Sequence, residues 1–570
     1  MRRLAVAAAV LLLSACSTDH GSSQTGAAGI TTASRSQLRD GGTLRWALDT
    51  VPATLNVYQP EATADSALLA QALLPGLFRL DEHAHPSPDA DFLAGADAAP
   101  DGKAVTYRLN PKAVWSDGTP ITAADFTAQW HALAGTDPAF HGEHPPGYAV
   151  IGAVAQGDDP HQVKVTFKQP YAGWRSLFSP LYPAAVTATP AAFNQALTTP
   201  GKSAGPFTVA TYDAEHGRVG LARNPRWWGE TAKAAAIDFL ATAPAARLDA
   251  LEGGKLDIAA LTTTVDRAVP TGAAGNAAPP DAAALAQASA QALKRAEALP
   301  GLALHRAPAA ALTQLTLNAA RGPLTDTTVR RALAHAVDRG QAAAAALGPL
   351  GLPATALGSH LLLAGQEGYQ DNSSSAGTEA PAALLDRAGW KTEGQTRHKD
   401  GKELALSLLV PDGSVTARRT ADSIAANLAA VGVAVHLQPV PFDAFVKDHL
   451  ATGDYDLALF SWPGAADPAA EERARYAKPQ PGPDGLPLVG RNYARAGTEE
   501  IDHLFDQATA TLDEKSRLAL LQQADARIWQ LAHSVPLYQR PDLVAVRTTV
   551  SNAGAFGFTT PRFQDIGFRA

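Results

Sequence analysis

The sequence contains a single cysteine, Cys16, which limits the chemistry available to the protein. One cysteine cannot form an intramolecular disulfide or a thiolate metal cluster. Cys16 follows a charged start, Arg2-Arg3, and an apolar run over Leu4–Leu13. A run of that length is typical of a signal peptide and is too short to cross a bilayer, which takes about 20 residues. We therefore expect Cys16 to mark a processing site rather than a redox centre.

Two short segments combine histidines with acidic residues, and neither has the spacing of a metal site. His83 and His85 lie in a polar stretch without a further regularly spaced ligand, so we expect them to be solvated. Residues 141–144 read H-G-E-H before Pro145-Pro146, which indicates a loop and not the helical H-E-x-x-H of a zinc protease. We predict no metal, no cofactor and no enzymatic activity. A hydrolase whose triad is scattered along the chain is the less favoured alternative.

The strongest candidate for ligand binding is the segment that follows an extended stretch at Tyr455–Phe460. It reads S-W-P-G-A-A-D-P over residues 461–468. Ligands of open α/β sheets bind at the carboxyl ends of strands, and the flat ring of Trp462 could form one wall of a pocket. On the residues alone, a core tryptophan is an equally good interpretation.

Length and charge bound the classes of function. The chain has 570 residues, which predicts two or three domains. Its formal net charge of -8 argues against nucleic acid as a partner, because no basic excess is available to neutralise phosphates.

The elements that must position the candidate pocket alternate regularly in the second half of the chain. Extended segments at Leu404–Val410, Val433–Leu437 and Tyr455–Phe460 are separated by helical patterns, the first of which contains Ile424 and Leu428. Strands that alternate with helices predict a parallel sheet with helices on its faces. The fold class is therefore α/β.

The segment Trp115–Asp125, W-S-D-G-T-P-I-T-A-A-D, predicts a strand, a turn and a capped helix. Asp117-Gly118 is a turn signal. Thr122 and Asp125 have the spacing of a capping box at the start of the helix. We expect this segment to be scaffold, because turns and caps rarely contact ligands.

A second distinctive stretch is Leu315–Asp338, in which Asn318 ends a strand and Asp326 is a candidate N-cap. Arg330 and Arg331 follow on the next helix. They could bind an anion, but a solvated face with one structural salt bridge is the favoured interpretation.

These motifs, in this order, resemble the family 5 extracellular solute-binding proteins of bacterial ABC importers. The resemblance also covers Asn224–Gly229 and Gly254–Ile258, and the residues before Cys16, L-S-A-C, resemble a lipobox. It implies a two-lobed periplasmic-binding-protein type II fold (cluster C), with an extra small domain in lobe I. The implied divisions are a lipoprotein signal peptide (1–16), a flexible tether (17–41), lobe I (42–60, 188–310 and 530–570), the extra α+β domain (61–187) and lobe II (311–529). Residues 262–300, rich in Ala, Pro and Gly, read as an exposed insertion with one helix near Ala282–Ala298.

The resemblance implies a lipid-anchored, extracytoplasmic protein that closes its lobes on a peptide or other small solute. It would deliver the solute to an ABC permease and ATPase complex, as a monomer that meets the membrane only through its anchor at Cys16. The candidate ligand-binding residues are Trp462, Ser461, Asp467, Asn318, Thr63 and Ala64.

One departure from the family pattern keeps an alternative open. Peptide-binding relatives carry W-x-x-D where this chain has Ala465, and Pro463 has no amide hydrogen to donate to a ligand. Capture of a free peptide amino terminus is therefore in doubt. The alternative is a degenerate binding protein that regulates or scaffolds the cell envelope without transporting nutrients.

Overall fold

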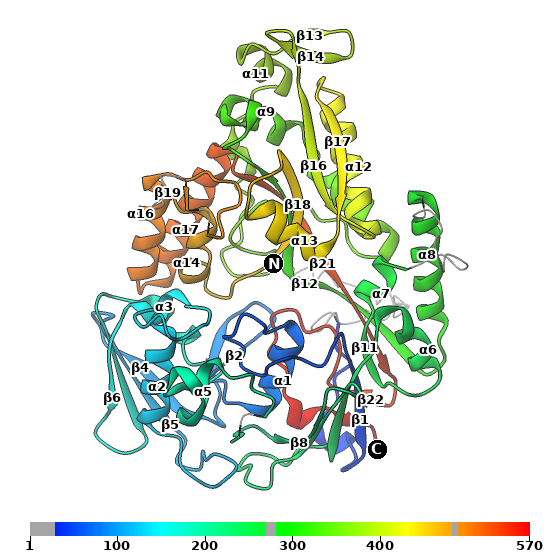
Figure 1. Ribbon diagram of the computed structural model, residues 1–570. Coiled ribbons are helices and arrows are strands. Elements are labelled where there is room, and N and C mark those ends of the chain that lie inside the picture. The colour runs from blue at the N-terminus through cyan, green and yellow to red at the C-terminus, as the bar shows by residue number, and fades with distance from the viewer. Residues whose placement is uncertain (1–28, 200, 269–280, 482–486, 489) are drawn as a thin grey trace, which may run out of the picture.

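A ten-stranded sheet runs through both lobes of the molecule (Figure 1). The computed structural model describes residues 29–199, 201–268, 281–481, 487–488 and 490–570, so Cys16 and the predicted signal peptide lie outside the described residues. In spatial order the strands are β17 (Ala434–Val440), β16 (Ala405–Pro411), β18 (Leu457–Pro463), β12 (Leu302–Leu317), β21 (Ser534–Arg547), β11 (Ile258–Ala260), β1 (Thr43–Leu48), β10 (Ala236–Ala241), β9 (Arg218–Arg223) and β8 (Phe207–Asp213).

Two long antiparallel strands, β12 and β21, join the lobes. One stretch of their pairing ends at Pro308 opposite Pro541, and the next begins at Leu312 opposite Gln539, with a shift of register between them. Proline has no amide hydrogen to donate to the ladder, so the strands are less firmly tied at this crossing. The shift of register therefore lies inside β21, within the segment 530–570 that the sequence assigns to lobe I.

The upper lobe in Figure 1 contains the predicted alternation of strands and helices. Strands β16, β17 and β18 are parallel. The helices of this lobe include α9 (Thr327–Ala336), α10 (Arg339–Leu347), α12 (Val415–Ala429), α16 (Glu499–Ala510) and α17 (Glu514–Leu531). Parallel strands need crossover connections, and the helices that supply them bury the apolar faces predicted from the sequence.

Arg330 corrects the expectation of a solvated face. Its side chain is buried, and its guanidinium donates to the carbonyls of Leu324 (2.8 Å) and Leu531 (3.0 Å). Arg330 thus satisfies the carbonyl of Leu531 at the carboxyl end of α17, which has no partner within that helix. The neighbouring Arg331 donates to the carbonyl of Ala376 (2.7 Å). Both guanidinium groups therefore have structural partners.

A four-stranded antiparallel sheet, in the order β4-β5-β7-β6, stands apart in the lower lobe. Its strands are β4 (Leu93–Ala98), β5 (Ala104–Leu109), β7 (Gln162–Phe167) and β6 (Ile151–Gln156). Helix α2 (Ala123–Leu133) packs on β6 and β7, and the predicted capping box of Thr122 and Asp125 is present. The Asp125 carboxylate accepts the N–H groups of Thr122 (2.9 Å) and Ala184 (2.8 Å). The motif is therefore scaffold, as predicted.

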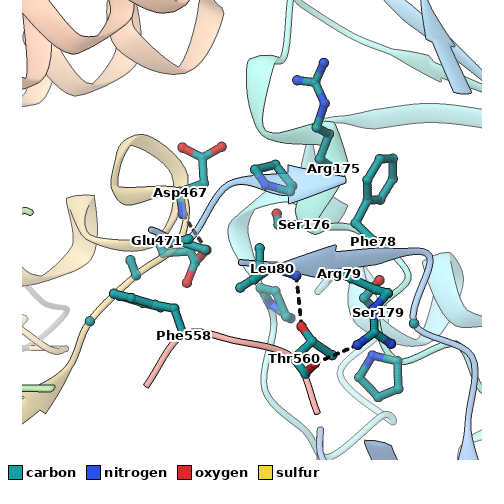
Figure 2. A pocket seen from close by; sticks show the side chains of 18 of the residues that line it. Phe78, Arg79, Leu80, Arg175, Ser176, Ser179, Asp467, Glu471, Phe558 and Thr560 are labelled. Atoms are coloured by element: carbon teal, nitrogen blue, oxygen red, sulfur yellow. Dashed lines mark hydrogen bonds between the residues drawn. The ribbon is translucent and has the colours of Figure 1, made fainter. Parts of the chain in front are cut away.

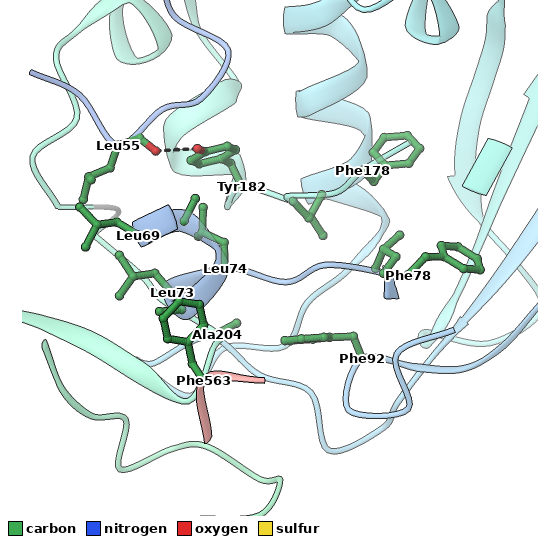
Figure 3. Close-up of a cluster of buried hydrophobic side chains, with 14 of the residues drawn as sticks. Leu55, Leu69, Leu73, Leu74, Phe78, Phe92, Phe178, Tyr182, Ala204 and Phe563 are labelled. Atoms are coloured by element: carbon green, nitrogen blue, oxygen red, sulfur yellow. Dashed lines mark hydrogen bonds between the residues drawn. The ribbon is translucent and has the colours of Figure 1, made fainter. Parts of the chain in front are cut away.

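The core of the lower lobe is built around α1 (Ala64–Leu73), as Figure 3 shows. Leu69 and Leu73 are fully buried there. The Tyr182 hydroxyl donates to the carbonyl of Leu55 at 2.6 Å, which leaves no unsatisfied polar group at that point. This packing holds α1 rigidly beneath the space between the lobes.

The predicted flexible tether needs correction for residues 29–41, the part that the structure describes. Ile30 bridges Gly554 and Leu38 bridges Arg569, so this segment packs along the C-terminal stretch of the chain. Leu38 is buried. Burial of the apolar Leu38 side chain holds this segment, which is otherwise largely polar, against the lower lobe.

In the described part of the region predicted as an exposed insertion, residues 262–268 and 281–300, the structure has two helices, α7 (Thr262–Asp266) and α8 (Ala282–Ala298), and α8 matches the predicted helix. Helix α8 contacts α7, β12 and α12, so it touches both lobes. Asp266 at the end of α7 accepts the hydroxyl of Ser414 (2.6 Å) and the N–H of Thr416 (2.7 Å). These bonds connect the lower lobe to the start of α12 in the upper lobe. Within the described residues, no helix has the length and apolar character needed to span a bilayer.

Candidate functional site

The two lobes enclose a cavity of about 810 Å³ (Figure 2). One wall is the segment Pro463–Pro468, which follows the carboxyl end of β18. The pocket predicted at this strand end is therefore present. The carboxyl ends of parallel strands meet at one edge of a sheet, which explains why the cavity opens there.

The lower lobe supplies the opposite wall. It includes one face of α1, the hairpin of β2 (Phe78–Leu80) and β3 (Pro86–Pro88), the turn η2 (Ala172–Ser176) and the C-terminal stretch from Phe558 to Gln564. The Leu80 N–H donates to Thr560 Oγ1 at 2.9 Å, and the Arg79 guanidinium donates to the Thr560 carbonyl at 2.7 Å (Figure 2). The hairpin is thereby fastened to the C-terminal stretch.

Asp467, one of the predicted site residues, lines the cavity and is already paired. Its Oδ1 lies 3.1 Å from Arg517 Nη1. Asp467 also packs against Gly173 of the lower lobe, where an added Cβ would lie only 2.8 Å from Asp467 Oδ2. The carboxylate thus closes part of the interface between the lobes and is neutralised by its own lobe.

Glu471, at the end of helix α14 (Pro468–Glu471), is a second carboxylate in the cavity wall. Its Oε1 accepts the Asp467 N–H at 3.3 Å. Enclosure between the lobes raises the pKa of the Glu471 carboxyl to about 7, and the Asp467 carboxylate adds to the shift. A carboxyl group with this pKa exchanges its proton near neutral pH.

Arg175 reaches the gap from the lower lobe, on the side of Asp467 (Figure 2). Its guanidinium carbon lies 4.3 Å from the centre of the Trp174 ring. Burial lowers the pKa of Arg175, and the positive charge of Arg517 in the opposite lobe lowers it further. The two like charges are balanced locally by Asp467 and Glu514.

Trp462 lies beside the cavity rather than in its lining. Its ring stacks on Tyr493, with centroids 5.5 Å apart and planes 7° apart, and the guanidinium carbon of Arg475 lies 4.4 Å from its centre. Side chains of its own lobe therefore engage the ring. Trp462 supports the wall formed by the residues after it, which corrects the expectation of a ring that faces the ligand.

Three other departures concern residues next to Trp462. Ser461 is bonded through its hydroxyl to Thr313 Oγ1 (2.9 Å) across β18 and β12, so it belongs to the sheet. Ala465, where the resemblance leads one to look for an aspartate, is buried, and its carbonyl accepts Gln366 Nε2 at 3.0 Å. The Pro463 carbonyl accepts the Arg475 guanidinium at 3.0 Å. Hydrogen bonds to other residues of the upper lobe account for all three positions.

Asn318 lies at the wrong edge of the sheet for a ligand contact. Strand β12 is antiparallel to β18, with Leu317 opposite Leu457 and Ala311 opposite Pro463. Its end is therefore about 20 Å from the cavity edge, at roughly 3.3 Å per residue. The buried Asn318 amide donates to the carbonyls of Gly453 (3.1 Å) and Tyr455 (2.9 Å) and stabilises a turn.

Thr63 and Ala64 also fall outside the cavity lining. Thr63 is the N-cap of α1, and its hydroxyl accepts the Ser66 N–H at 3.4 Å. Ala64 is the first residue of the helix. The next turns of α1 face the cavity through Ala67, Ala70, Gln71 and Leu74.

His83 and His85, expected to be solvated, connect the two lobes at the edge of the cavity. His83 Nδ1 donates to the Gly365 carbonyl at 2.6 Å. His85 Nε2 lies 2.8 Å from Glu367 Oε2, and its Nδ1 lies 3.3 Å from Asp81 Oδ2. Partial burial would lower the pKa of His85, but the Asp81 and Glu367 carboxylates outweigh it and raise the pKa above 6.5. We refer to the contacts of His83 and His85 with residues 365–367 as the histidine clasp.

The described residues also bear on the hydrolase alternative. Residues 201–205 read G-K-S-A-G, which has the spacing of a G-x-S-x-G nucleophile motif. They lead into strand β8 rather than a helix, and the buried Ser203 donates its N–H to Ser116 Oγ at 3.1 Å. The strand–turn–helix context of a nucleophile elbow is therefore missing here. Within the described residues, no group of three metal-ligating side chains is placed to share an ion.

Glu471 was not predicted as a site residue, although its position in the sequence could have indicated it. Glu471 lies four residues after Asp467, on a short helix that starts at the strand end already singled out. His83 and His85 formed a visible pair, but their partners in residues 365–367 are distant in sequence. No local pattern could have joined these two segments.

Comparison with known proteins gives a family and a set of relatives. A sequence model described as bacterial extracellular solute-binding proteins, family 5 Middle, matches residues 90–482. The oligopeptide-binding protein OppA of Mycobacterium tuberculosis is 36% identical over 542 residues, 93% of this chain and 85% of that protein. The probable monoacyl phosphatidylinositol tetramannoside-binding protein LpqW of M. tuberculosis is 28% identical over 389 residues, 63% of this chain and 56% of that protein. Among solved structures, the periplasmic EDTA-binding protein EppA shares the fold, with a TM-score of 0.81 and 24% identity over 95% of this chain and 98% of that chain.

Proposed function

Because the chain belongs to the bacterial extracellular solute-binding proteins of family 5, we propose that it is the lipid-anchored receptor of an ABC importer for peptide-like solutes. The mycobacterial OppA, which is named for oligopeptide binding, is similar over nearly the whole chain. In this proposal a solute bound between the lobes stabilises their closed arrangement, and the closed protein docks on a permease whose ATPase drives transport.

The observation that carries the proposal is the cavity between the lobes. Its volume of about 810 Å³ falls within the range of about 300–1,000 Å³ that is usual for small-molecule sites. Its lining combines apolar rings with a few charged groups, which suits a solute with an apolar body and polar ends; the rings include Phe78, Phe92, Trp227 and Phe558.

Hinge closure supplies the coupling between binding and delivery. The crossing of β12 and β21 is the flexible connection in this proposal, and the histidine clasp and the contact of Asp467 with Gly173 form when the lobes meet. A solute that touches both walls gains contacts only in the closed arrangement, so it shifts the population towards closure.

Two parts of the proposal concern residues that the sequence singled out. Asp467 contributes to the solute site from the cavity wall, and Trp462 and Ser461 hold that wall in place. Lipidation at Cys16 would keep the protein at the outer face of the cell membrane. Replacement of Cys16 by serine tests the anchor: the protein should move from the membrane fraction to the medium, and labelling with a palmitate analogue should disappear.

The function is tested by thermal unfolding of the purified protein with libraries of short peptides. A ligand at 100 times its Kd stabilises the folded protein by about 2.7 kcal/mol, which raises the melting temperature by several degrees. Increases in melting temperature that occur with one class of peptide would support the proposal. No shift with any peptide or related solute would count against it.

The alternative, an envelope regulator without nutrient transport, has one supporting observation. The chain also resembles LpqW, which is named for binding a mannosylated lipid, although the match spans little more than half of that protein. Deletion of the gene separates the two functions. Loss of growth on peptides as the amino-acid source supports transport, whereas a changed envelope lipid profile with normal peptide uptake supports regulation.

A further inference from the structure

Most carboxylates that line the cavity are already paired with a cation. The pairs are Asp467 with Arg517 (3.1 Å), Glu367 with His85 (2.8 Å), Asp89 with Arg79 (3.5 Å), Glu514 with Arg517 (3.8 Å) and Asp91 with Arg562 (3.9 Å). Within the described residues, Glu143 and Glu471 line the cavity without an ion pair.

These two carboxylates differ in their surroundings. Glu143 lies in the loop after β5 and α2, next to the exposed His144 and before α3 (Pro146–Ala149), at a solvated position. Glu471 lies between the two lobes with its side chain exposed to the cavity, and Figure 2 shows its carboxylate directed into that cavity, on the side of Leu80 and Phe558. A carboxylate that faces the cavity without a cation can pair with a charged group of a solute, and a solute that displaces water from it must supply a compensating charge.

We propose that Glu471 accepts a cationic group of the solute and is the residue that selects for it. The inference rests on the proposed function, since it assigns a role within the same cavity. A positively charged nitrogen placed against Glu471 would replace the water that the solute displaces from the carboxylate, and a charge-assisted hydrogen bond is stronger than a neutral one. Asp467 cannot play this part as readily, because Arg517 already neutralises it.

The charges around Glu471 make the binding of a cation sensitive to pH. Asp467 opposes ionisation of Glu471, whereas Arg475 and Arg491 favour it. With its pKa at about 7, the empty site holds a proton for much of the time at neutral pH. A bound cation favours the ionised carboxylate, so binding releases a proton. Affinity for a cationic solute should therefore fall as the pH drops below 7.

The experiment compares Glu471→Gln with Glu143→Gln and the wild type. The glutamine of Glu471→Gln keeps the size of the side chain and an oxygen that can accept the Asp467 N–H. The probes are two tetrapeptide libraries of equal composition, one with free amino termini and one N-acetylated, each in a lysine-free and a lysine-containing version. Binding is measured by calorimetry at pH 8, and melting temperatures verify that each variant is folded.

We expect Glu471→Gln to weaken binding of cationic peptides by about 10- to 100-fold, the loss typical of a hydrogen bond to a charged group. Glu143→Gln should bind as the wild type does. If the cation is the terminal ammonium, acetylation weakens wild-type binding and has no further effect on Glu471→Gln. If it is a side chain, the acetylated lysine-containing library still binds and loses affinity in Glu471→Gln.

A second measurement does not depend on the size of the loss. Calorimetry at pH 7 in buffers of different ionisation enthalpy should show about half a proton more released on binding by the wild type than by Glu471→Gln, because a group with a pKa of about 7 is half protonated at that pH. Wild-type binding with an unchanged affinity in Glu471→Gln, or a loss confined to Glu143→Gln, would overturn the inference and leave the proposed function standing. Failure of the wild type to bind any library would instead overturn the proposed function.

Discussion

The histidine clasp predicts that closure of the lobes depends on pH. His85 contacts Asp81 in its own hairpin and Glu367 in the other lobe, and the ring of His83 lies 6.0 Å away between centroids. A protonated imidazole can donate to both carboxylates, whereas a neutral one can donate to a single partner. In the proposed hinge motion the Asp81 contact persists, because both residues belong to one hairpin, whereas the Glu367 contact across the lobes breaks when they separate. Protonation of His85 should therefore favour closure.

The structure also bounds the size of this effect. The side chains of His85 and Glu367 are 44% and 59% exposed, so solvent screens the pair, and such pairs contribute about 0.2–1 kcal/mol. That range corresponds to a change of about 1.4- to 5-fold in the closure equilibrium. Because the pKa of His85 is raised above 6.5, the contribution is fully present below that pH and is lost as the pH rises through the higher pKa of the closed form.

The assay compares wild type with Glu367→Gln in affinity for one peptide, at several pH values between 5.5 and 8.5. Titration of Glu471 affects both proteins alike, so it cancels in the ratio of their dissociation constants. We expect the wild type to bind about 1.4- to 5-fold more tightly than the variant at pH 5.5, with the ratio approaching one at pH 8.5 and shrinking in 1 M salt. A ratio that is flat across this range, or that rises with pH, would refute the reasoning.

Three further predictions concern stability and the hinge. Asp257→Ala should lower the free energy of unfolding by about 1–3 kcal/mol in urea titrations, because the buried carboxylate accepts both the main-chain N–H (2.9 Å) and the guanidinium (2.7 Å) of Arg45; an unchanged midpoint would contradict this. In the same titrations, Arg330→Met should lower the free energy of unfolding by about 2–3 kcal/mol, because it leaves the buried carbonyls of Leu324 and Leu531 without donors. Arg331→Met, at a half-buried position, should lower the free energy of unfolding by less. Asp266→Ala removes a carboxylate that caps α12 from the other lobe, so it should lower the free energy of unfolding by about 1 kcal/mol. It should also widen the distribution of interlobe distances measured by fluorescence energy transfer. Equal distributions in the variant and the wild type would exclude a role of Asp266 in holding the lobes together.

Local patterns predicted the elements of this protein well. The capping box of Thr122 and Asp125, the helix over Ala282–Ala298 and the parallel strands of the upper lobe are all present. Each depends on neighbours within a few residues: hydrophobic periodicity, a cap or a turn glycine. The rule that ligands meet strand ends also directed attention to the segment that became one cavity wall.

Individual side chains were predicted less well. Arg330 was assigned to a solvated face, yet it is buried against the end of α17, which is distant in sequence. Asn318 was placed at a ligand site, but the antiparallel course of β12 puts it at the far edge of the sheet. In both cases the sequence contained the residue type and not the direction in which the neighbouring element runs.

The sequence by itself determined that the chain folds into alternating strands and helices and that it resembles a solute-binding family. It also indicated a candidate ligand site at the strand end near Trp462. Only the tertiary structure decided which charged side chains in that cavity have an ion-pair partner and which do not. Arg517 neutralises Asp467, His85 meets Glu367 from the opposite lobe, and Glu471 lines the cavity without a cation among the described residues. The reason is physical: hydrophobic periodicity acts over neighbouring residues, whereas an ion pair forms wherever the fold brings two side chains within a few ångströms, however far apart they lie in the sequence.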